Sequence, residues 1–410
     1  MTETASIKRL RLSKFKLNTL LNITKAINEN LPAEELLKKA EDVLVNDLNI
    51  GKIIIIMFDE KWDIILESGC PPGCSSGISI EETLLPITDI TYFSSSEDKS
   101  LKEFDVILPV YNNNAPLAYV LIGDIDEEEK GVSPIIKHLH FIQTLSNIII
   151  VAIENIRLFE KSLKQESTRK ELELASKMQS LLIPSNDNLP NNEKIFITGF
   201  YHPHHEVGGD YYDCVQLSEQ EFGFCIADVS GKGMSAALLM ANFQATLRAL
   251  FTLDISLEDL VRKLNKSVLS SAHGEKFITL FIARYNIETR ALSYVNAAHN
   301  APLLYEMGSK KMYKLQSNCL GIGMLDDIPI VDAVTREISQ ESKIICYTDG
   351  LSELPDEFGR EMGTKAVEKN IKNNSSIDVN IRDLIFEERI LEDNERLFDD
   401  VSLLGIQFYI

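Results

Sequence analysis

The sequence Phe-Cys-Ile-Ala-Asp-Val-Ser-Gly-Lys-Gly-Met-Ser-Ala-Ala-Leu-Leu-Met-Ala occupies residues 224–241 and combines a strand, a turn and a helix start. Its first residues are apolar and predict a buried strand. The two glycines permit a tight turn, and the Ala-, Leu- and Met-rich continuation predicts a helix over 235–251. Asp228 therefore ends a strand and faces a turn. Such an aspartate either caps the helix or holds a hard cation.

Three further segments place acidic side chains beside apolar runs. Asp210 lies in Val-Gly-Gly-Asp-Tyr-Tyr-Asp, before a predicted strand, and Asp349 follows the apolar run Ile-Ile-Cys-Tyr. Asp399 and Asp400 precede another apolar run, which begins at Val401. Carboxylates at the ends of several strands can converge on one ion cluster, because hard cations prefer oxygen ligands.

These segments, in this order, resemble those of metal-dependent protein phosphatases, in particular the bacterial branch typified by SpoIIE and RsbU. The segments Asn-Ala-Ala-His-Asn-Ala-Pro-Leu-Leu (296–304) and Leu-Gly-Ile-Gly (320–323) extend the resemblance over residues 170–410. The resemblance implies two antiparallel sheets packed face to face and flanked by helices. It also implies a phosphoserine/phosphothreonine protein phosphatase that works with a pair of Mg²⁺ or Mn²⁺ ions.

The resemblance also implies roles for individual residues. Asp228 would bridge both ions, and the carbonyl of Val229 would bind one of them. Asp349 and Asp399 would complete the shell of the second ion, and Asp210 would act directly or through a bound water. Asp210 and Asp228 are thus the candidate catalytic residues.

The choice between Asp399 and Asp400 stays open, because adjacent strand residues face opposite ways and only one of them should point at the ions. The family pattern favours Asp399, since its ligand lies three residues before a Ser or Thr, here Ser402. Histidines are not needed for hard-ion chemistry. We expect surface or supporting roles for His202, His204 and His205, and a packing or turn role for His299, which the resemblance includes.

Composition limits the function further. The 410 residues include 62 acidic and 41 basic side chains, and the resulting formal charge of −21 argues against nucleic-acid binding. The sequence shows no apolar run of about 18 residues, so we predict no membrane span. The six scattered cysteines indicate a reducing, cytoplasmic location.

The predicted fold class is α+β, with three regions: a GAF-like α/β sensor domain at 1–140, a helical linker at 141–184 and a phosphatase domain at 185–410. The sensor prediction depends on the order of elements, not on a motif: helices to about residue 50, strands at 52–58, 62–67, 105–111 and 117–123, then a long helix. Such a domain either holds a small molecule between residues 68 and 104 or serves only dimerisation.

The linker carries apolar residues at alternating steps of four and three, which indicates a coiled-coil seam: Leu145, Ile149, Ala152, Ile156, Phe159 and Leu163. Residues 164–170 are polar, and the apolar spacing resumes at Leu174. The weak segment is either a switch that changes helix register or a plain spacer. The seam predicts a parallel homodimer.

Two functions from different classes follow. The first is a metal-dependent protein phosphatase controlled by its sensor domain, which acts on a phosphorylated regulator of the anti-sigma-factor antagonist type. The second is a catalytically silent module that senses a ligand and docks a partner. Silent members lose aspartates, and every family position is filled here, so the enzyme is favoured.

Within the phosphatase domain, strands are expected at 196–201, 211–217, 222–227, 277–286, 291–297, 343–347 and 401–409, and a mobile segment at 370–379.

Overall fold

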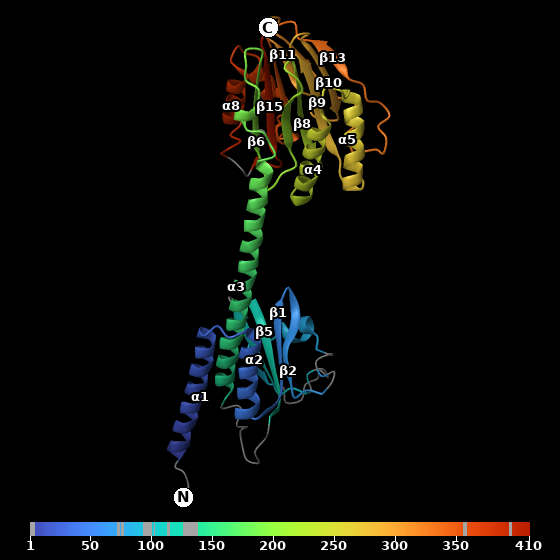
Figure 1. Ribbon diagram of the computed structural model, residues 1–410. Coiled ribbons are helices and arrows are strands. Elements are labelled where there is room, and N and C mark those ends of the chain that lie inside the picture. Colours follow the sequence, from blue (N-terminus) through green and yellow to red (C-terminus); the bar gives the residue numbers. More distant parts are fainter. Residues whose placement is uncertain are drawn as a thin grey trace. The chain divides into compact units, whose positions relative to one another are not determined.

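The computed structural model describes residues 5–71, 74, 78–92, 101, 103–112, 115–125, 138–355, 359–392 and 396–410. The chain divides into two compact units, Met1–Ser167 and Thr168–Ile410. Figure 1 shows the helices and strands of each unit. The boundary between the units falls inside the predicted linker.

The N-terminal unit begins with α1 (Ala5–Asn28) and α2 (Ala33–Asp42), which are separated at Pro32. Among the described residues, five strands form one antiparallel sheet in the order β2-β1-β5-β4-β3. The strands are β1 (Ile50–Asp59), β2 (Lys61–Ser68), β3 (Thr91–Tyr92), β4 (Val106–Asn112) and β5 (Ala115–Ile125), with short helical turns at Val43–Asp47 and Ile80–Leu84. The two-residue strand β3 was not predicted.

Strand β1 is buried on both faces of this sheet. Ile53 and Ile55 pack in a cluster with buried residues of α1, α2 and α3, whereas Ile54 and Ile56 belong to a second cluster on the other face. A central strand that is covered on both sides needs a continuous apolar run, as the sequence has here. The GAF-like assignment stays a prediction, because the segment 68–104 lies only partly within the described residues.

Helix α3 (Leu139–Ser180) is 42 residues long, and the predicted coiled-coil seam is wrong in its first half. Leu145, Ile149 and Ala152 lie buried in the core of their own unit, so they are not available to a partner helix. The same spacing serves a coiled coil and a helix packed on a sheet, and the sheet takes these residues here. Further along, Leu158, Phe159, Leu163, Leu174 and Met178 are exposed.

Among the described helices, α3 alone is long and apolar enough to cross a membrane by length and composition, and half of its apolar window is buried in the protein.

The C-terminal unit is a sandwich of two antiparallel sheets, confirming the predicted fold class. In its described part, one sheet has the order β13-β10-β9-β8-β7 and the other β12-β11-β14-β15-β6. The first contains β7 (Tyr211–Gln216), β8 (Glu221–Val229), β9 (Ile278–Asn286), β10 (Ala291–Ala297) and β13 (Val334–Glu337). The second contains β6 (Ile195–His202), β11 (Leu303–Glu306), β12 (Lys311–Lys314), β14 (Ser342–Tyr347) and β15 (Val401–Phe408).

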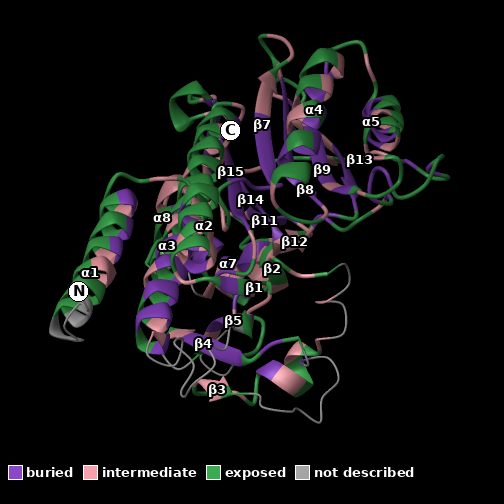
Figure 2. Cartoon of the chain, turned by 90° about the horizontal axis from the view of Figure 1, so that it is seen from below, coloured by how far each residue is buried: buried purple, intermediate pink, exposed green. Residues whose placement is uncertain are grey.

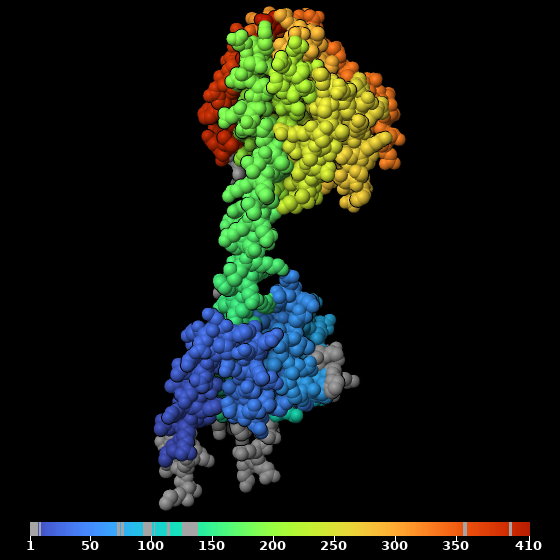
Figure 3. Space-filling view, in the orientation of Figure 1, coloured from blue at the N-terminus to red at the C-terminus, as the bar shows by residue number. Residues whose placement is uncertain are grey.

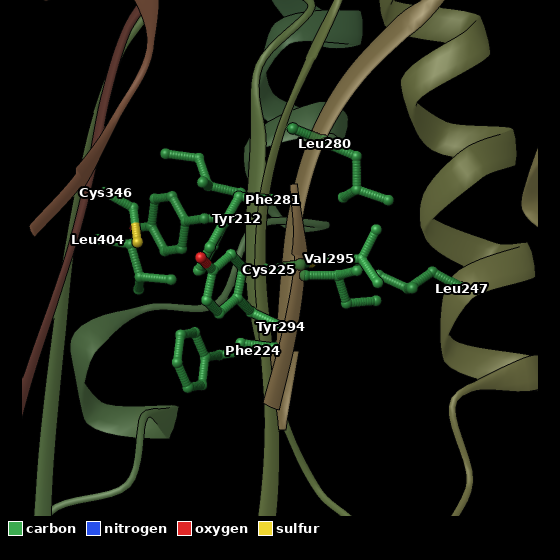
Figure 4. Close-up of a cluster of buried hydrophobic side chains, with 14 of the residues drawn as sticks. Tyr212, Phe224, Cys225, Leu247, Leu280, Phe281, Tyr294, Val295, Cys346 and Leu404 are labelled. Carbon is green, nitrogen blue, oxygen red and sulfur yellow. The ribbon is translucent and has the colours of Figure 1, made fainter. Parts of the chain in front are cut away.

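Alternation along the strands builds the cores on either side of each sheet. Cys346 and Leu404 point between the two sheets, towards Tyr212 and Phe281 of the facing sheet (Figure 4). Their neighbours in sequence, such as Tyr347, point outward into a second cluster. This inside-outside pattern follows from the two-residue repeat of a strand.

Helices cover both outer faces of the sandwich. Helices α4 (Met234–Leu250) and α5 (Leu257–Ala272) pack on the sheet that contains β8, and their outer sides are exposed in Figure 2. The other sheet is covered by α7 (Lys365–Ile371) and α8 (Ile377–Glu387). Two short elements, α6 (Asp349–Ser352) and a turn at Asn186–Asn188, complete the described helices. The short strands β11, β12 and β13 were not predicted.

Segment 370–379, expected to be mobile, is instead anchored by a buried lysine. The Lys343 ammonium, fully buried in β14, donates to the Asn373 carbonyl (2.9 Å) and to the Asn380 side chain (2.8 Å). Ile371 and Ile377 are also buried. Polar composition indicated mobility, but amide groups gathered around one lysine order this segment.

Lys343 should make stability depend on pH. Burial lowers its pKa from 10.5 to about 8. The unfolded chain therefore holds this proton more tightly, and stability rises with pH between about 8 and 10.5. Urea titrations at pH 7.5 and at pH 10 measure the free energy of unfolding. Between these pH values, we expect the unfolding free energy of wild type to increase by about 2 kcal/mol more than that of Lys343→Met. Parallel pH profiles for the two proteins would contradict this expectation.

Candidate metal centre

The two sheets bring acidic residues together at one end of the sandwich. Strand β8 ends at Asp228 and Val229, and β7 begins just after Asp210. The register, with Tyr211 opposite Ala227, places Asp210 opposite Asp228. In the other sheet, β14 and β15 are paired neighbours. Asp349 follows β14, and Asp399 and Asp400 precede β15, so these side chains come to the same edge of the sandwich.

Asp210 is buried at the centre of the cluster, and Asp228 beside it is half-buried. Burial raises the pKa of Asp210 well above its usual range, and the charges of Asp228 and Asp400 act in the same direction. Burial, together with the charges of Asp349, Asp399 and Asp400, raises the pKa of Asp228 to about 7. Several like charges in one partly desolvated place are costly unless cations neutralise them.

Asp349 and Asp400 share this environment. Burial raises the pKa of Asp349, and the charge of Asp399 adds to the effect. Burial also raises the pKa of Asp400, although backbone amides of His204 and Gly209 oppose the shift. The electrostatic coupling therefore links all five predicted aspartates into one site.

Asp399 and Asp400 differ in what their carboxylates contact. The Asp400 oxygens accept hydrogen bonds from the backbone amides of His204 (2.9 Å) and Gly209 (2.7 Å). Asp399 accepts from the amide of Asp400 (2.9 Å), and its other oxygen lies 3.0 Å from the ammonium of Lys232. Asp400 thus anchors the loop that precedes Asp210, whereas Asp399 contacts the positively charged ammonium group of Lys232. This arrangement supports Asp399 as the ion ligand, which stays a prediction.

Two positions beside Asp400 have room only for glycine, because atoms of Asp400 lie too close for a Cβ. A Cβ added to Gly208 would lie 2.0 Å from an Asp400 carboxylate oxygen, and one added to Gly350 would lie 2.1 Å from the Asp400 carbonyl oxygen. Larger residues at these positions would displace Asp400. The glycine after Asp349 in the sequence thus has a packing reason.

The turn after β8 is anchored to the neighbouring strand. Ser230 donates its amide to the Phe277 carbonyl (2.9 Å) and accepts from the Phe277 amide at its hydroxyl (2.9 Å). Lys276 donates to the Ser230 carbonyl (2.8 Å). The Val229 backbone, whose carbonyl is a predicted ligand, is therefore held between fixed neighbours.

The donor set fits hard divalent ions. Every predicted ligand offers oxygen, which suits Mg²⁺ and Mn²⁺. Among the described residues, no three Asp, Glu, His or Cys side chains are already arranged so that they could coordinate one metal ion. Lys232 instead supplies positive charge at Asp399. The fit therefore rests on donor chemistry and uncompensated charge.

The histidines take supporting positions. His299 is buried, its Nδ1 lies 2.8 Å from the Thr279 hydroxyl, and burial lowers its pKa to about 3. A neutral imidazole at pH 7 suits packing rather than proton donation. His204 contributes its backbone amide to Asp400.

Sequence reasoning missed three side chains at this site. The Thr348 hydroxyl donates to Asp210 (2.8 Å) and accepts from the Ser402 amide (2.9 Å), joining β14, β15 and the Asp210 loop. Lys232 contacts Asp399, and only its place between two glycines hinted at a role. The third is Gln179, near the end of α3.

Gln179 clamps the loop that carries Asp210. Its buried side chain donates to the Gly208 carbonyl (2.6 Å) and accepts from the Gly208 amide (3.1 Å). Gly209, the next residue, donates to Asp400. The last turns of α3 are therefore tied directly to the candidate centre.

We expect Gln179→Ala to lower Mn²⁺-dependent turnover by about tenfold while the protein stays folded. The substitution leaves both polar groups of Gly208 without this partner, and each such loss costs about 1–3 kcal/mol. The same substitution at Gln165, an exposed residue of α3, is the control. Steady-state kinetics with p-nitrophenyl phosphate measures the effect, and equal rates for both variants would contradict it.

Comparison with known proteins shows a family match within the C-terminal unit. Residues 218–409 match the protein-family model described as Stage II sporulation protein E (SpoIIE). The chain is 27% identical over 195 residues to the phosphoserine phosphatase RsbU of Bacillus subtilis, covering 48% of this chain and 57% of that protein. It is 25% identical over 395 residues to protein IcfG of Synechocystis sp., covering 89% of this chain and 56% of that protein. The chain thus spans about half the length of these curated relatives.

A solved structure confirms the fold of the C-terminal unit. The SiaA-PP2C domain of Pseudomonas aeruginosa superposes with a TM-score of 0.52 at 17% identity, covering 60% of this chain and 98% of that domain. The predicted fold class is confirmed, and the predicted resemblance to SpoIIE-type phosphatases is confirmed for residues 218–409.

Proposed function

We propose, from the SpoIIE-type match of residues 218–409, that this protein is a metal-dependent phosphoserine/phosphothreonine protein phosphatase. The observation that carries the proposal is the meeting of Asp210, Asp228, Asp349 and Asp399 at one end of the sandwich, with the pKa of Asp228 raised to about 7. The names of two relatives, the phosphoserine phosphatases RsbU and RsbP of Bacillus subtilis, support it.

Each residue of the candidate centre has its own proposed role in phosphate hydrolysis. Bound Mg²⁺ or Mn²⁺ would supply a nucleophilic water near neutral pH and neutralise phosphoryl oxygens. The ions would be held by Asp228, the Val229 carbonyl, Asp349 and Asp399. Thr348 keeps Asp210 in place through its 2.8 Å hydrogen bond. Asp400 keeps the preceding loop closed.

We further propose that the substrate is a phosphorylated regulator of the anti-sigma-factor antagonist type and that the protein acts in the cytoplasm. The substrate class comes from the resemblance to the SpoIIE and RsbU branch. All six cysteines are free, as is usual in a reducing compartment.

Control by the N-terminal unit is proposed to run through α3. The exposed residues Leu158, Phe159 and Leu163 suit a homodimer, in place of the buried first half of the predicted seam. On α1, Leu10, Leu17 and Leu21 are also exposed and follow coiled-coil steps of seven and four. A signal at the sensor unit that shifts α3 would reach Asp210 through Gln179.

A titration of the full chain with Mn²⁺ tests the activity. We expect p-nitrophenyl phosphate and phosphoserine protein to be hydrolysed only with Mn²⁺ or Mg²⁺ present, and chelation by EDTA to abolish both reactions. Hydrolysis that persists at full rate in EDTA, or no hydrolysis at any ion concentration, would overturn the proposal.

A further inference from the structure

A groove lies between α4 and α5 at the end of the sheet that carries the candidate metal centre. Its cavity volume is about 440 Å³, and it is lined by Leu238 and Asn242 of α4, Ser271 of α5, and His273 and Lys276 of the following turn. Figure 3 shows the outer surface of these helices in yellow-green and yellow. The start of α4 and the end of α5 both adjoin the turn after β8.

The groove is joined to the candidate metal centre by direct contacts. Lys276, which lines the groove, donates to the Ser230 carbonyl (2.8 Å), and Phe277 exchanges two hydrogen bonds with Ser230. Ser230 is two residues beyond Asp228. A molecule in the groove therefore lies beside the turn that carries the central aspartate.

Exposed apolar side chains lie in the groove lining and beside it. Leu238, which lines the groove, is 64% exposed. Met234 and Phe277, each next in sequence to a lining residue, and Met324 are 36–40% exposed. The 320–324 loop adjoins this edge, since a Cβ on Gly323 would lie 3.3 Å from the Phe277 Cα. Several large apolar side chains around one groove mark an interaction surface rather than scattered exposure.

Resting on the proposed function, we infer that this groove and its apolar rim dock the phosphoprotein substrate. A phosphoserine side chain is short, so a folded substrate that places its phosphate at Asp228 must lay its own surface over the adjoining rim. The chain carries a charge of −21, and a phosphorylated substrate adds negative charge. Long-range attraction therefore does not favour the encounter, and apolar contact is the available source of affinity.

The occupant that fits is thus a folded phosphoprotein with an apolar side chain beside its phosphoserine. That side chain would enter the groove against Leu238. Lys276 and His273 would lie near backbone carbonyls or acidic groups of the substrate. A small phosphate ester would reach the metal centre without touching the rim.

The test compares two substrates on Leu238→Asp in the full chain, with Leu253→Asp as control. Leu253 is an exposed leucine between α4 and α5 at the opposite end of both helices. The substrates are p-nitrophenyl phosphate and a purified serine-phosphorylated anti-sigma-factor antagonist. We expect KM for the phosphoprotein to rise by about tenfold or more in Leu238→Asp, as for loss of an interface anchor. KM and kcat for p-nitrophenyl phosphate should stay within about twofold, and Leu253→Asp should match wild type on both.

Three outcomes would overturn the inference. Unchanged phosphoprotein KM in Leu238→Asp, and in a second variant that fills the groove, Asn242→Arg, excludes docking there. Equal loss with both substrates points to damage of the centre, and a changed sedimentation coefficient assigns the groove to a second copy of the chain. Wild type that hydrolyses neither substrate refutes the proposed function itself, and the docking inference with it.

Discussion

Replacing Asp228 with asparagine is expected to abolish metal-dependent hydrolysis, with a loss of about a thousandfold or more. On the proposed function, the Asp228 charge would help to hold the ions and would supply several kcal/mol of transition-state stabilisation. The fold should remain, since the amide has the same shape as the carboxyl. Kinetics with p-nitrophenyl phosphate in Mn²⁺ measures the loss. Asp254→Asn, at an exposed position between α4 and α5, is the matched control.

The same substitution should change how stability depends on pH in the absence of metal. The folded pKa of Asp228, about 7, is above its ordinary value of 3.8, so the folded state holds this proton more tightly. Its contribution is fully present below pH 3.8 and is lost as pH rises through 7. The wild-type chain in EDTA should therefore lose more stability than Asp228→Asn between pH 5 and pH 8.

For the kinetic prediction, turnover of Asp228→Asn within about tenfold of wild type would show that Asp228 does not have the proposed bridging role.

Alanine at Asp399 and at Asp400 should give two different defects. We expect Asp399→Ala to weaken Mn²⁺ binding by about tenfold or more. Its thermal unfolding midpoint should stay near that of wild type, because its ion pair with Lys232 is exposed and such pairs contribute little to stability. Asp400→Ala removes the acceptor of the His204 and Gly209 amides. Each buried amide left without a partner costs about 1–3 kcal/mol, so this variant should unfold at a lower temperature.

Isothermal titration with Mn²⁺ and calorimetric unfolding separate the two defects. Asp400→Ala may be compared at a temperature where it is fully folded, so that metal affinity is measured on native protein. The reverse pattern, with metal affinity lost in Asp400→Ala and stability lost in Asp399→Ala, would show that the register is off by one residue.

Local pattern was sufficient for much of the C-terminal unit. The apolar run before Asp228, the glycines after it and the helix formers beyond them predicted β8, the turn and α4, because each signal acts over a few residues. The order of the aspartates along the chain indicated one cluster. The short edge strands β11, β12 and β13 escaped prediction, since each has only four residues and depends on pairing with a neighbour.

Other features were decided only when distant segments packed together. Residue spacing put Leu145 and Ile149 on one helix face, but the sheet of their own unit covers that face. Neither the tie between Gln179 and Gly208 nor that between Thr348 and Asp210 has a sequence signature, because each joins residues far apart in the chain. Local sequence patterns were enough to predict β8, the turn after it and the acidic side chains of the candidate centre. Which atoms those side chains contact follows from the packing of the two sheets, because hydrogen-bond partners and burial depend on segments distant in sequence.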